Sequence, residues 1–150
     1  MDDEPPGGDP RPDAVARLLR ARVVAGELWL AVDGRSMWPT IRPPATVLLV
    51  ASSSPRRGEV WAFVAGDEAI VVHRCERRAG TGHVFRGDAM AGADPWVPVE
   101  RLVGRVATVV DVRGRRSLGP ADRARGMGRS AVQRGRKWVG RLMVRLGRRR

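Results

Sequence analysis

The sequence contains few of the side chains that usually supply catalytic or metal-binding chemistry. Cys75 is the single cysteine among 150 residues, which excludes an internal disulfide. The two histidines, His73 and His83, form no recognisable zinc ligand set with it, so we expect no metal and no other cofactor. The single lysine is Lys137, near the C-terminus. A serine–lysine catalytic pair is therefore excluded from the part of the chain that we expect to fold.

Long apolar runs are also missing. No segment approaches the ~20 consecutive apolar residues that a membrane-spanning helix requires. Residues 1–6 are acidic and rich in proline, whereas a secretory signal begins with a positively charged segment. We therefore expect a cytoplasmic protein, or one that is held peripherally at the inner face of the membrane.

Positive charge is abundant and unevenly distributed. The formal net charge is +12, and residues 121–150 hold eleven Lys/Arg against one acid, so this segment supplies +10 of it. Such a segment favours a polyanionic partner, either an anionic membrane surface or a nucleic acid. Residues 132–146 alternate apolar and basic positions at helical spacing, which favours the membrane surface. Nucleic acid is less favoured because Trp138 is the only aromatic residue there for base stacking.

Short apolar segments separated by turn residues predict a mainly β protein. We expect a disordered segment over 1–12, a β domain over 13–112, and a basic linker and amphipathic tail over 113–150. A short helix should begin at Asp13 as its N-cap and end at Gly26. Strands are expected at residues 28–32, 46–50, 60–64, 69–74, 84–86, 96–99 and 103–112. The expected architecture is a coiled antiparallel sheet or barrel, with a short N-terminal helix and a basic C-terminal helix.

Ser36 lies in the segment with the most unusual local sequence, residues 34–40. Gly34 and Pro39 are incompatible with a regular helix or a central strand, so Ser36 is expected on a constrained bend. A serine presented in this way is a candidate nucleophile. A turn serine that bonds its own backbone is the commoner alternative.

A nucleophilic serine needs a base, and only the two histidines are available. His73 ends the apolar strand 69–72, where a rigid imidazole is expected, although a histidine that merely ends a strand is the alternative. His83 follows a glycine turn and is expected to be solvated and mobile. Asp88 and Asp94, in the following loop, are candidate partners for a histidine base, or ordinary turn residues.

Together these segments resemble the conserved boxes of type I signal peptidases and the related SOS-repressor peptidases. His73-Arg74 is similar to the box of the endoplasmic-reticulum and archaeal branch, in which histidine replaces the bacterial lysine. Arg86 stands where the family's aspartate box has lysine, but the spacing between Asp88 and Asp94 is kept. The boxes occur in the family's order at residues 34–40 (serine box), 58–60 (strand start), 71–74 (base box), 85–94 (aspartate box) and 103–106 (closing strand).

The resemblance implies a serine endopeptidase that cleaves a precursor or leader peptide after small residues. It implies that Ser36 is the nucleophile and supplies an oxyanion donor through its backbone N–H, and that His73 is the base. Asp94 would orient His73, with Asp88 as the second candidate. The substrate would add as an extended strand, and Met37 and Trp38 would line its groove, with Trp61 as a further candidate. Core filling is the alternative role for these three side chains.

The sequence also departs from the family. Gly34 stands where many signal peptidases have a serine hydroxyl that helps to bind the oxyanion, and in this respect it resembles the SOS-repressor branch. The usual N-terminal membrane anchor is not found ahead of the serine box. Two alternatives remain: a self-processing or regulatory domain of SOS-repressor type, or an inactive nucleic-acid- or membrane-binding protein that uses its arginine-rich tail. The first is less favoured because the residues before Gly34 leave no room for a helix-turn-helix domain.

Overall fold

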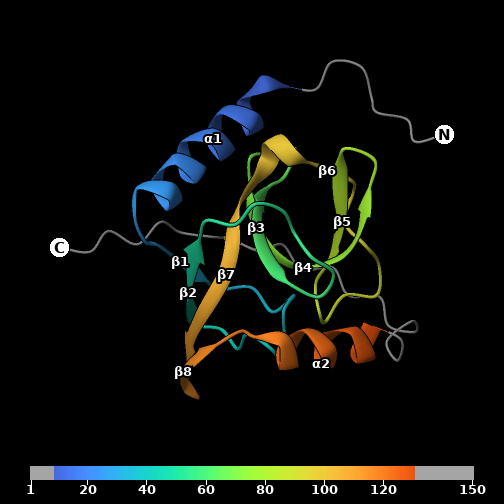
Figure 1. Cartoon of the computed structure of the whole chain (residues 1–150). Coiled ribbons are helices and arrows are strands. Elements are labelled where there is room, and N and C mark those ends of the chain that lie inside the picture. The colour runs from blue at the N-terminus through green and yellow to red at the C-terminus, as the bar shows by residue number, and fades with distance from the viewer. Residues whose placement is uncertain (1–8, 131–150) are drawn as a thin grey trace.

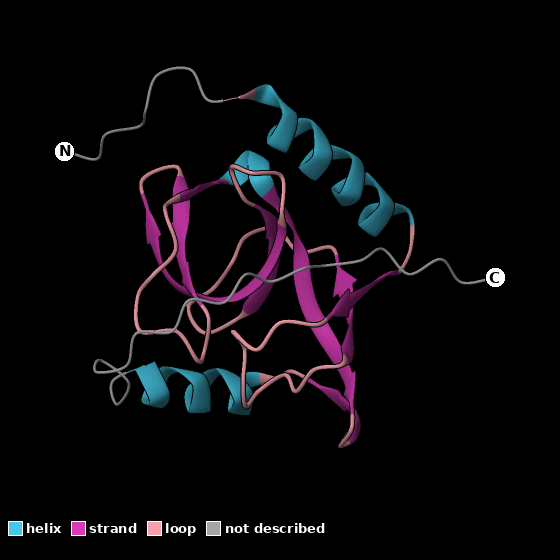
Figure 2. Ribbon diagram, turned by 180° about the vertical axis from the view of Figure 1, so that it is seen from behind, coloured by secondary structure: helices cyan, strands magenta, loops and turns pink. Residues whose placement is uncertain are grey.

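The computed structural model describes residues 9–130 and shows one curled antiparallel sheet with a helix at each end (Figure 1). The sheet order is β1-β2-β7-β3-β4-β5-β6, and β8 pairs with β7 beside this path. Seen from behind, the strands curl into a half-barrel (Figure 2). The strands are β1 (Leu28–Val32), β2 (Ala45–Val50), β3 (Val60–Val64), β4 (Ile70–Ala79), β5 (Gly82–Arg86), β6 (Val97–Pro98), β7 (Leu102–Asp111) and β8 (Gly114–Ser117). The predicted mainly β, antiparallel architecture is confirmed.

Buried aliphatic side chains explain why these segments form the sheet. All five residues of β3 are buried, and the neighbouring strands β2 and β7 contribute Val47, Leu49 and Val106, which are fully buried. Each such side chain stabilises the fold by roughly 1.5–3 kcal/mol relative to an exposed one. Because β3 and β4 lie between β7 and β5, residues of β4 are held rigidly in the middle of the curved sheet.

Two helices flank the sheet, α1 (Pro10–Ala25) and α2 (Pro120–Ser130). The N-cap of α1 is Asp9, whose carboxylate accepts from the Arg11 N–H, and not Asp13 as the sequence predicted. Pro10 can open the helix because the first helical position needs no N–H. The predicted disorder over 1–12 was therefore wrong for residues 10–12, which are helical, and residues 1–8 lie outside the described part of the chain. Neither helix in the described part of the chain has the length and apolar composition to cross a membrane.

The prediction of a loose linker from residue 113 was wrong for residues 113–130. β8 pairs with β7, and the buried carboxylate of Asp111 forms ion pairs with Arg113 and Arg116 across this hairpin, at 2.8 and 3.1 Å. Burial disfavours the Asp111 anion, but hydrogen bonds from Arg113, the Arg42 backbone N–H and Arg116 together outweigh it and hold the pKa of Asp111 below its usual value. The predicted amphipathic segment 132–146 lies outside the described residues.

Candidate active site

Ser36 sits on a tight turn that follows β1, as the sequence predicted. The Trp38 N–H donates to the Arg35 carbonyl at 3.0 Å, and the Ile41 N–H donates to the Met37 carbonyl at 2.9 Å. Met37 and Ile41 are both buried in the core, and their packing there fixes the turn against the sheet. The Ser36 backbone N–H donates no hydrogen bond within residues 9–130, so the fold leaves this donor without an acceptor.

His73 lies on β4 and faces the Ser36 turn. Its Nε2 is 2.9 Å from Ser36 Oγ, which is hydrogen-bonding distance. The Phe63 ring on the neighbouring strand packs edge-on against the imidazole, with 6.3 Å between the ring centroids. The ring is buried, so its orientation is fixed by the sheet and by Phe63. The structure thus brings together the two residues that the sequence separates by 37 positions.

Asp94 completes the chain of contacts. One of its carboxylate oxygens lies 2.5 Å from His73 Nδ1. The Asp94 N–H donates to the Phe85 carbonyl at 2.8 Å, which fixes the loop that carries the carboxylate to the end of β5. With the imidazole proton on Nδ1, His73 donates to Asp94 and accepts from the Ser36 hydroxyl, so one tautomer satisfies both contacts. This is the arrangement in which a hydroxyl can lose its proton to a neutral imidazole.

Asp88 has a different role from Asp94, although the sequence could not separate them. Its carboxylate receives a bidentate pair of hydrogen bonds from Arg74, both at 2.7 Å, and one from the Thr40 hydroxyl at 2.5 Å. The Arg74 and Asp88 side chains are only 6% and 3% exposed. Asp88 therefore does not contact His73. It ties together the Ser36 turn, β4 and the loop after β5.

Gly87 allows this loop to approach the nucleophile closely, a role that the sequence did not reveal. A Cβ atom at Gly87 would lie 2.5 Å from the Ser36 carbonyl oxygen and 3.1 Å from His73 Nε2. Two residues later, the Ala89 N–H donates to the same Ser36 carbonyl at 2.9 Å. Only a residue without a side chain fits between the loop and the Ser36–His73 pair.

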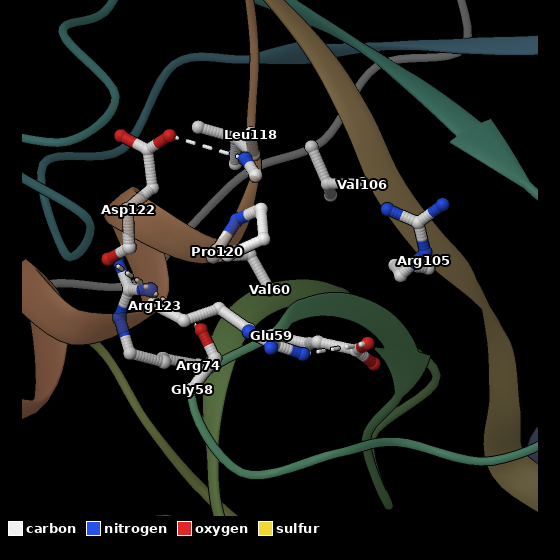
Figure 3. Close-up of a pocket in the computed structure, with 11 residues that line it drawn as sticks. Gly58, Glu59, Val60, Arg74, Arg105, Val106, Leu118, Pro120, Asp122 and Arg123 are labelled. Carbon is white, nitrogen blue, oxygen red and sulfur yellow. Dashed lines mark hydrogen bonds and ion pairs between the residues drawn. The ribbon is translucent and has the colours of Figure 1, made fainter.

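The helix α2 packs against the outer side of Arg74 (Figure 3). The Arg74 guanidinium donates to the Gly58 carbonyl at 2.7 Å and to the Asp122 carbonyl of α2 at 3.3 Å. A Cβ atom at Gly126 would lie 2.2 Å from this guanidinium. No sequence pattern predicted this contact, because residues 113–130 were expected to form a linker.

A small cavity of about 80 Å³ lies beside this contact, between α2 and the strands β3, β4 and β7. In its wall Glu59 forms an ion pair with Arg123, and the Asp122 carboxylate accepts from the Gly119 N–H (Figure 3). The Arg74 guanidinium pairs with Asp88 outside the cavity. Ser36, His73 and Asp94 do not line it. The cavity is therefore separate from the candidate catalytic groups.

The predicted groove residues have different environments. Met37 is only 1% exposed and belongs to the core, so the prediction that it lines a substrate groove is wrong. Trp61 is also buried, and its indole N–H donates to Glu59 at 3.0 Å. Trp38 is 41% exposed and lies on the Ser36 turn, so it alone of the three can contact a substrate there.

The remaining histidine and the cysteine are poor candidates for this chemistry. The prediction that His83 is solvated was wrong, because β5 and β6 leave it only 2% exposed. Burial, with the charge of Arg78, lowers the pKa of His83, and neither ring nitrogen has a partner within residues 9–130. Burial also raises the pKa of the Cys75 thiol to about 11, so at neutral pH it is not a thiolate nucleophile.

Comparison with models of known protein families, with curated proteins and with solved structures finds no match to this chain. The likeness to signal peptidases therefore rests on the order of the sequence boxes. The geometry of Ser36, His73 and Asp94 is an independent observation, since it depends on no relative.

Proposed function

We propose that the protein is a serine endopeptidase, with Ser36 as nucleophile, His73 as general base and Asp94 as the carboxylate that orients His73. The observation that carries this proposal is the continuous line of contacts from Ser36 Oγ through His73 to Asp94, at 2.9 and 2.5 Å. A serine that only stabilises a turn has no need of a buried imidazole that is itself held by a carboxylate. The resemblance to the signal-peptidase boxes supports the same assignment.

The reaction proceeds by acyl transfer. Ser36 Oγ attacks the scissile carbonyl carbon while its proton moves to His73 Nε2, and the resulting imidazolium is stabilised by Asp94. The tetrahedral intermediate expels the amine, which receives the proton from His73 as the C–N bond breaks. A water molecule, deprotonated by His73, then attacks the acyl-enzyme and releases the carboxylic acid with Ser36 regenerated.

A backbone N–H stabilises the oxyanion of the tetrahedral intermediate. The free N–H of Ser36 is the donor that the structure offers on the nucleophile itself. Gly34 supplies no hydroxyl to assist it. One oxyanion donor is worth about 2.7–4 kcal/mol, so the enzyme is expected to be slower than relatives that use a side-chain hydroxyl as well.

The substrate class follows from the resemblance, which implies cleavage after small residues in an extended precursor or leader peptide. We place the protein in the cytoplasm, with its basic tail holding it peripherally at the anionic inner face of the membrane. No cofactor enters this mechanism, and nucleic acid is not part of the proposal.

Peptide cleavage tests the assignment. The protein is incubated with a mixture of extended peptides that carry alanine or serine at varied positions, and cleavage products are identified by mass spectrometry. Wild type and Ser53→Ala, which removes an exposed loop serine, should cleave the same bonds, whereas Ser36→Ala and His73→Ala should lose cleavage by at least about 10³-fold. Equal cleavage by wild type and Ser36→Ala would overturn the proposal, and so would no cleavage by wild type.

A further inference from the structure

Two arginines flank the exposed indole on the nucleophile turn. The guanidinium carbons of Arg42 and Arg35 lie 4.9 and 5.9 Å from the ring centroid of Trp38. Cation–π contacts of this kind restrict long arginine side chains and so reduce the entropy that a ligand must overcome. Both cations are therefore held in place on the same turn as Ser36.

These two guanidiniums have no carboxylate partner in the part of the chain that the structure describes. Asp111 accepts the Arg42 backbone N–H but forms its ion pairs with Arg113 and Arg116. Both of these arginines also donate to the Thr40 carbonyl, which brings further positive charge to the turn. The Arg42 Nε–H is buried and has no acceptor among the described residues. The turn therefore carries positive charge that the fold leaves unneutralised.

A bound peptide would pass close to these cations. Arg35 is the residue directly before Ser36, so its Cα lies ~3.8 Å from that of the nucleophile. An extended peptide advances ~3.3–3.6 Å per residue, so side chains within about four residues of the scissile bond come within reach of a guanidinium. A carboxylate at such a position would form charge-assisted hydrogen bonds, which arginine makes in bidentate geometry.

We propose that Arg35 and Arg42, ordered by Trp38, select peptide substrates that carry a glutamate or aspartate within about four residues of the scissile bond. The inference rests on the proposed peptidase function and names the substrate class of that same site. A peptide is favoured over a lipid headgroup because the unneutralised charge lies on the nucleophile turn itself, where a substrate must pass.

Matched peptides test this selection. Sets of peptides that share one cleavable sequence carry Glu, Gln or Lys at each position up to four residues on either side of the scissile bond. Wild type should cleave the Glu peptide about five- to tenfold faster than its Gln counterpart at one or more positions, with Lys slowest. This preference should decline near 1 M salt, where the Debye length is only about 3 Å. In Arg35→Gln/Arg42→Gln, the Glu-to-Gln ratio should fall to about one.

An exposed arginine on α1, Arg17, provides the matched control. Arg17→Gln should keep the wild-type ratio, because α1 lies at the other end of the sheet from α2 (Figure 1), whereas Arg74 connects the Ser36 turn to α2 by donating to Thr40 and to the Asp122 carbonyl. A wild-type ratio of one at every position would overturn the inference while leaving the peptidase proposal intact. A ratio that survives in the double variant would also overturn it. If no peptide is cleaved in a Ser36-dependent way, both proposals fail.

Anionic vesicles provide the last arm of the test. Binding to vesicles that contain phosphatidylglycerol is compared between wild type and Arg35→Gln/Arg42→Gln by sedimentation. The inference predicts equal binding. If the double variant no longer binds the vesicles but keeps the Glu-to-Gln ratio of wild type, the two arginines bind a lipid surface and the inference is wrong.

Discussion

Asp88 and Asp94 lie six positions apart in one loop, yet they have different partners. Asp94 contacts His73 and is partly exposed, while Asp88 is buried against Arg74 and Thr40. Local sequence could not separate them, because both are aspartates in a glycine-rich loop. The difference arises from which residue of β4 each one meets after the loop folds back, His73 for Asp94 and the adjacent Arg74 for Asp88.

Amide substitutions should separate these two roles. Asp94→Asn should lower the turnover number of Ser36-dependent hydrolysis by about 10⁴-fold, because the imidazole loses the group that fixes its tautomer, with little change in melting temperature. Asp88→Asn leaves Arg74 buried and unpaired, and should lower the free energy of unfolding by about 3–5 kcal/mol. Steady-state kinetics of both variants gives the turnover number, and urea unfolding gives the free energy of unfolding. The opposite pattern would reverse the assignment.

His83 should make stability depend on pH. Its pKa in the folded protein is lower than the ordinary 6.5, so the unfolded chain binds a proton more readily as the pH falls below 6.5. The contribution of His83 to stability is therefore complete above about pH 7, and it is lost as the pH falls toward the lowered pKa of His83 in the folded protein. His83→Leu should remove this component. Urea unfolding of wild type and variant between about pH 7.5 and pH 5 measures it, and identical pH dependence of the two proteins would contradict it.

At the scale of elements, apolar runs predicted the strands well, and polar segments were predicted poorly. β1, β2 and β3 consist mostly of apolar residues, whose burial decides their conformation. β8 and α2 contain few apolar residues, and polar contacts stabilise them. Asp111 forms ion pairs with Arg113 and Arg116 at β8, and Arg74 donates to the Asp122 carbonyl of α2, 48 positions away. Such contacts leave no periodic pattern for a sequence to show.

The loop after β5 should tolerate a methyl group at one glycine and not at another. Gly87→Ala should reduce Ser36-dependent cleavage by at least about 10²-fold, since the added Cβ forces the loop away from Ser36 and His73. Gly92→Ala, in the same loop, meets no atom within 4 Å and should retain activity. Initial rates with one cleavable peptide measure both variants. Equal rates for the two would show that the close approach at Gly87 is not needed.

The packing of α2 on Arg74 should contribute to the free energy of unfolding. Gly126→Ala adds a methyl group 2.2 Å from a guanidinium that Asp88 and the Gly58 carbonyl hold in place. We expect a loss of about 1–3 kcal/mol in the free energy of unfolding, even though alanine favours helix by up to ~1 kcal/mol. Gly119→Ala, which meets open space, should change it by less than about 0.5 kcal/mol. A more stable Gly126→Ala protein would contradict the described packing.

At the scale of the whole molecule, the residues that determine the fold and the residues that carry the net charge lie mostly in different parts of the chain. The sequence predicted a mainly β domain because its apolar segments are short and regularly spaced. Most of the net charge of +12 lies in residues 121–150. The structure shows that the first ten of these residues are helical and that α2 contacts Arg74, so a truncation that begins at residue 121 would also disturb the domain.

A truncation after α2 is therefore the appropriate test of the tail. Deleting residues 131–150 removes eight Lys/Arg, each worth about 1 kcal/mol near an anionic surface. We expect the full chain to bind vesicles containing phosphatidylglycerol in a salt-sensitive way, and the truncated protein to lose this binding while keeping peptide cleavage. Sedimentation with vesicles measures it. Undiminished binding by the truncated protein would exclude the tail as the membrane contact.

Covalent labelling tests the central assignment most directly. A fluorophosphonate probe phosphonylates a serine only when a base activates it, and intact-mass spectrometry with peptide mapping locates the adduct. Our account predicts one adduct per chain, at Ser36, with labelling abolished in Ser36→Ala and strongly slowed in His73→Ala and Asp94→Asn. Labelling of wild type at a different serine, or undiminished labelling of Ser36→Ala, would contradict it.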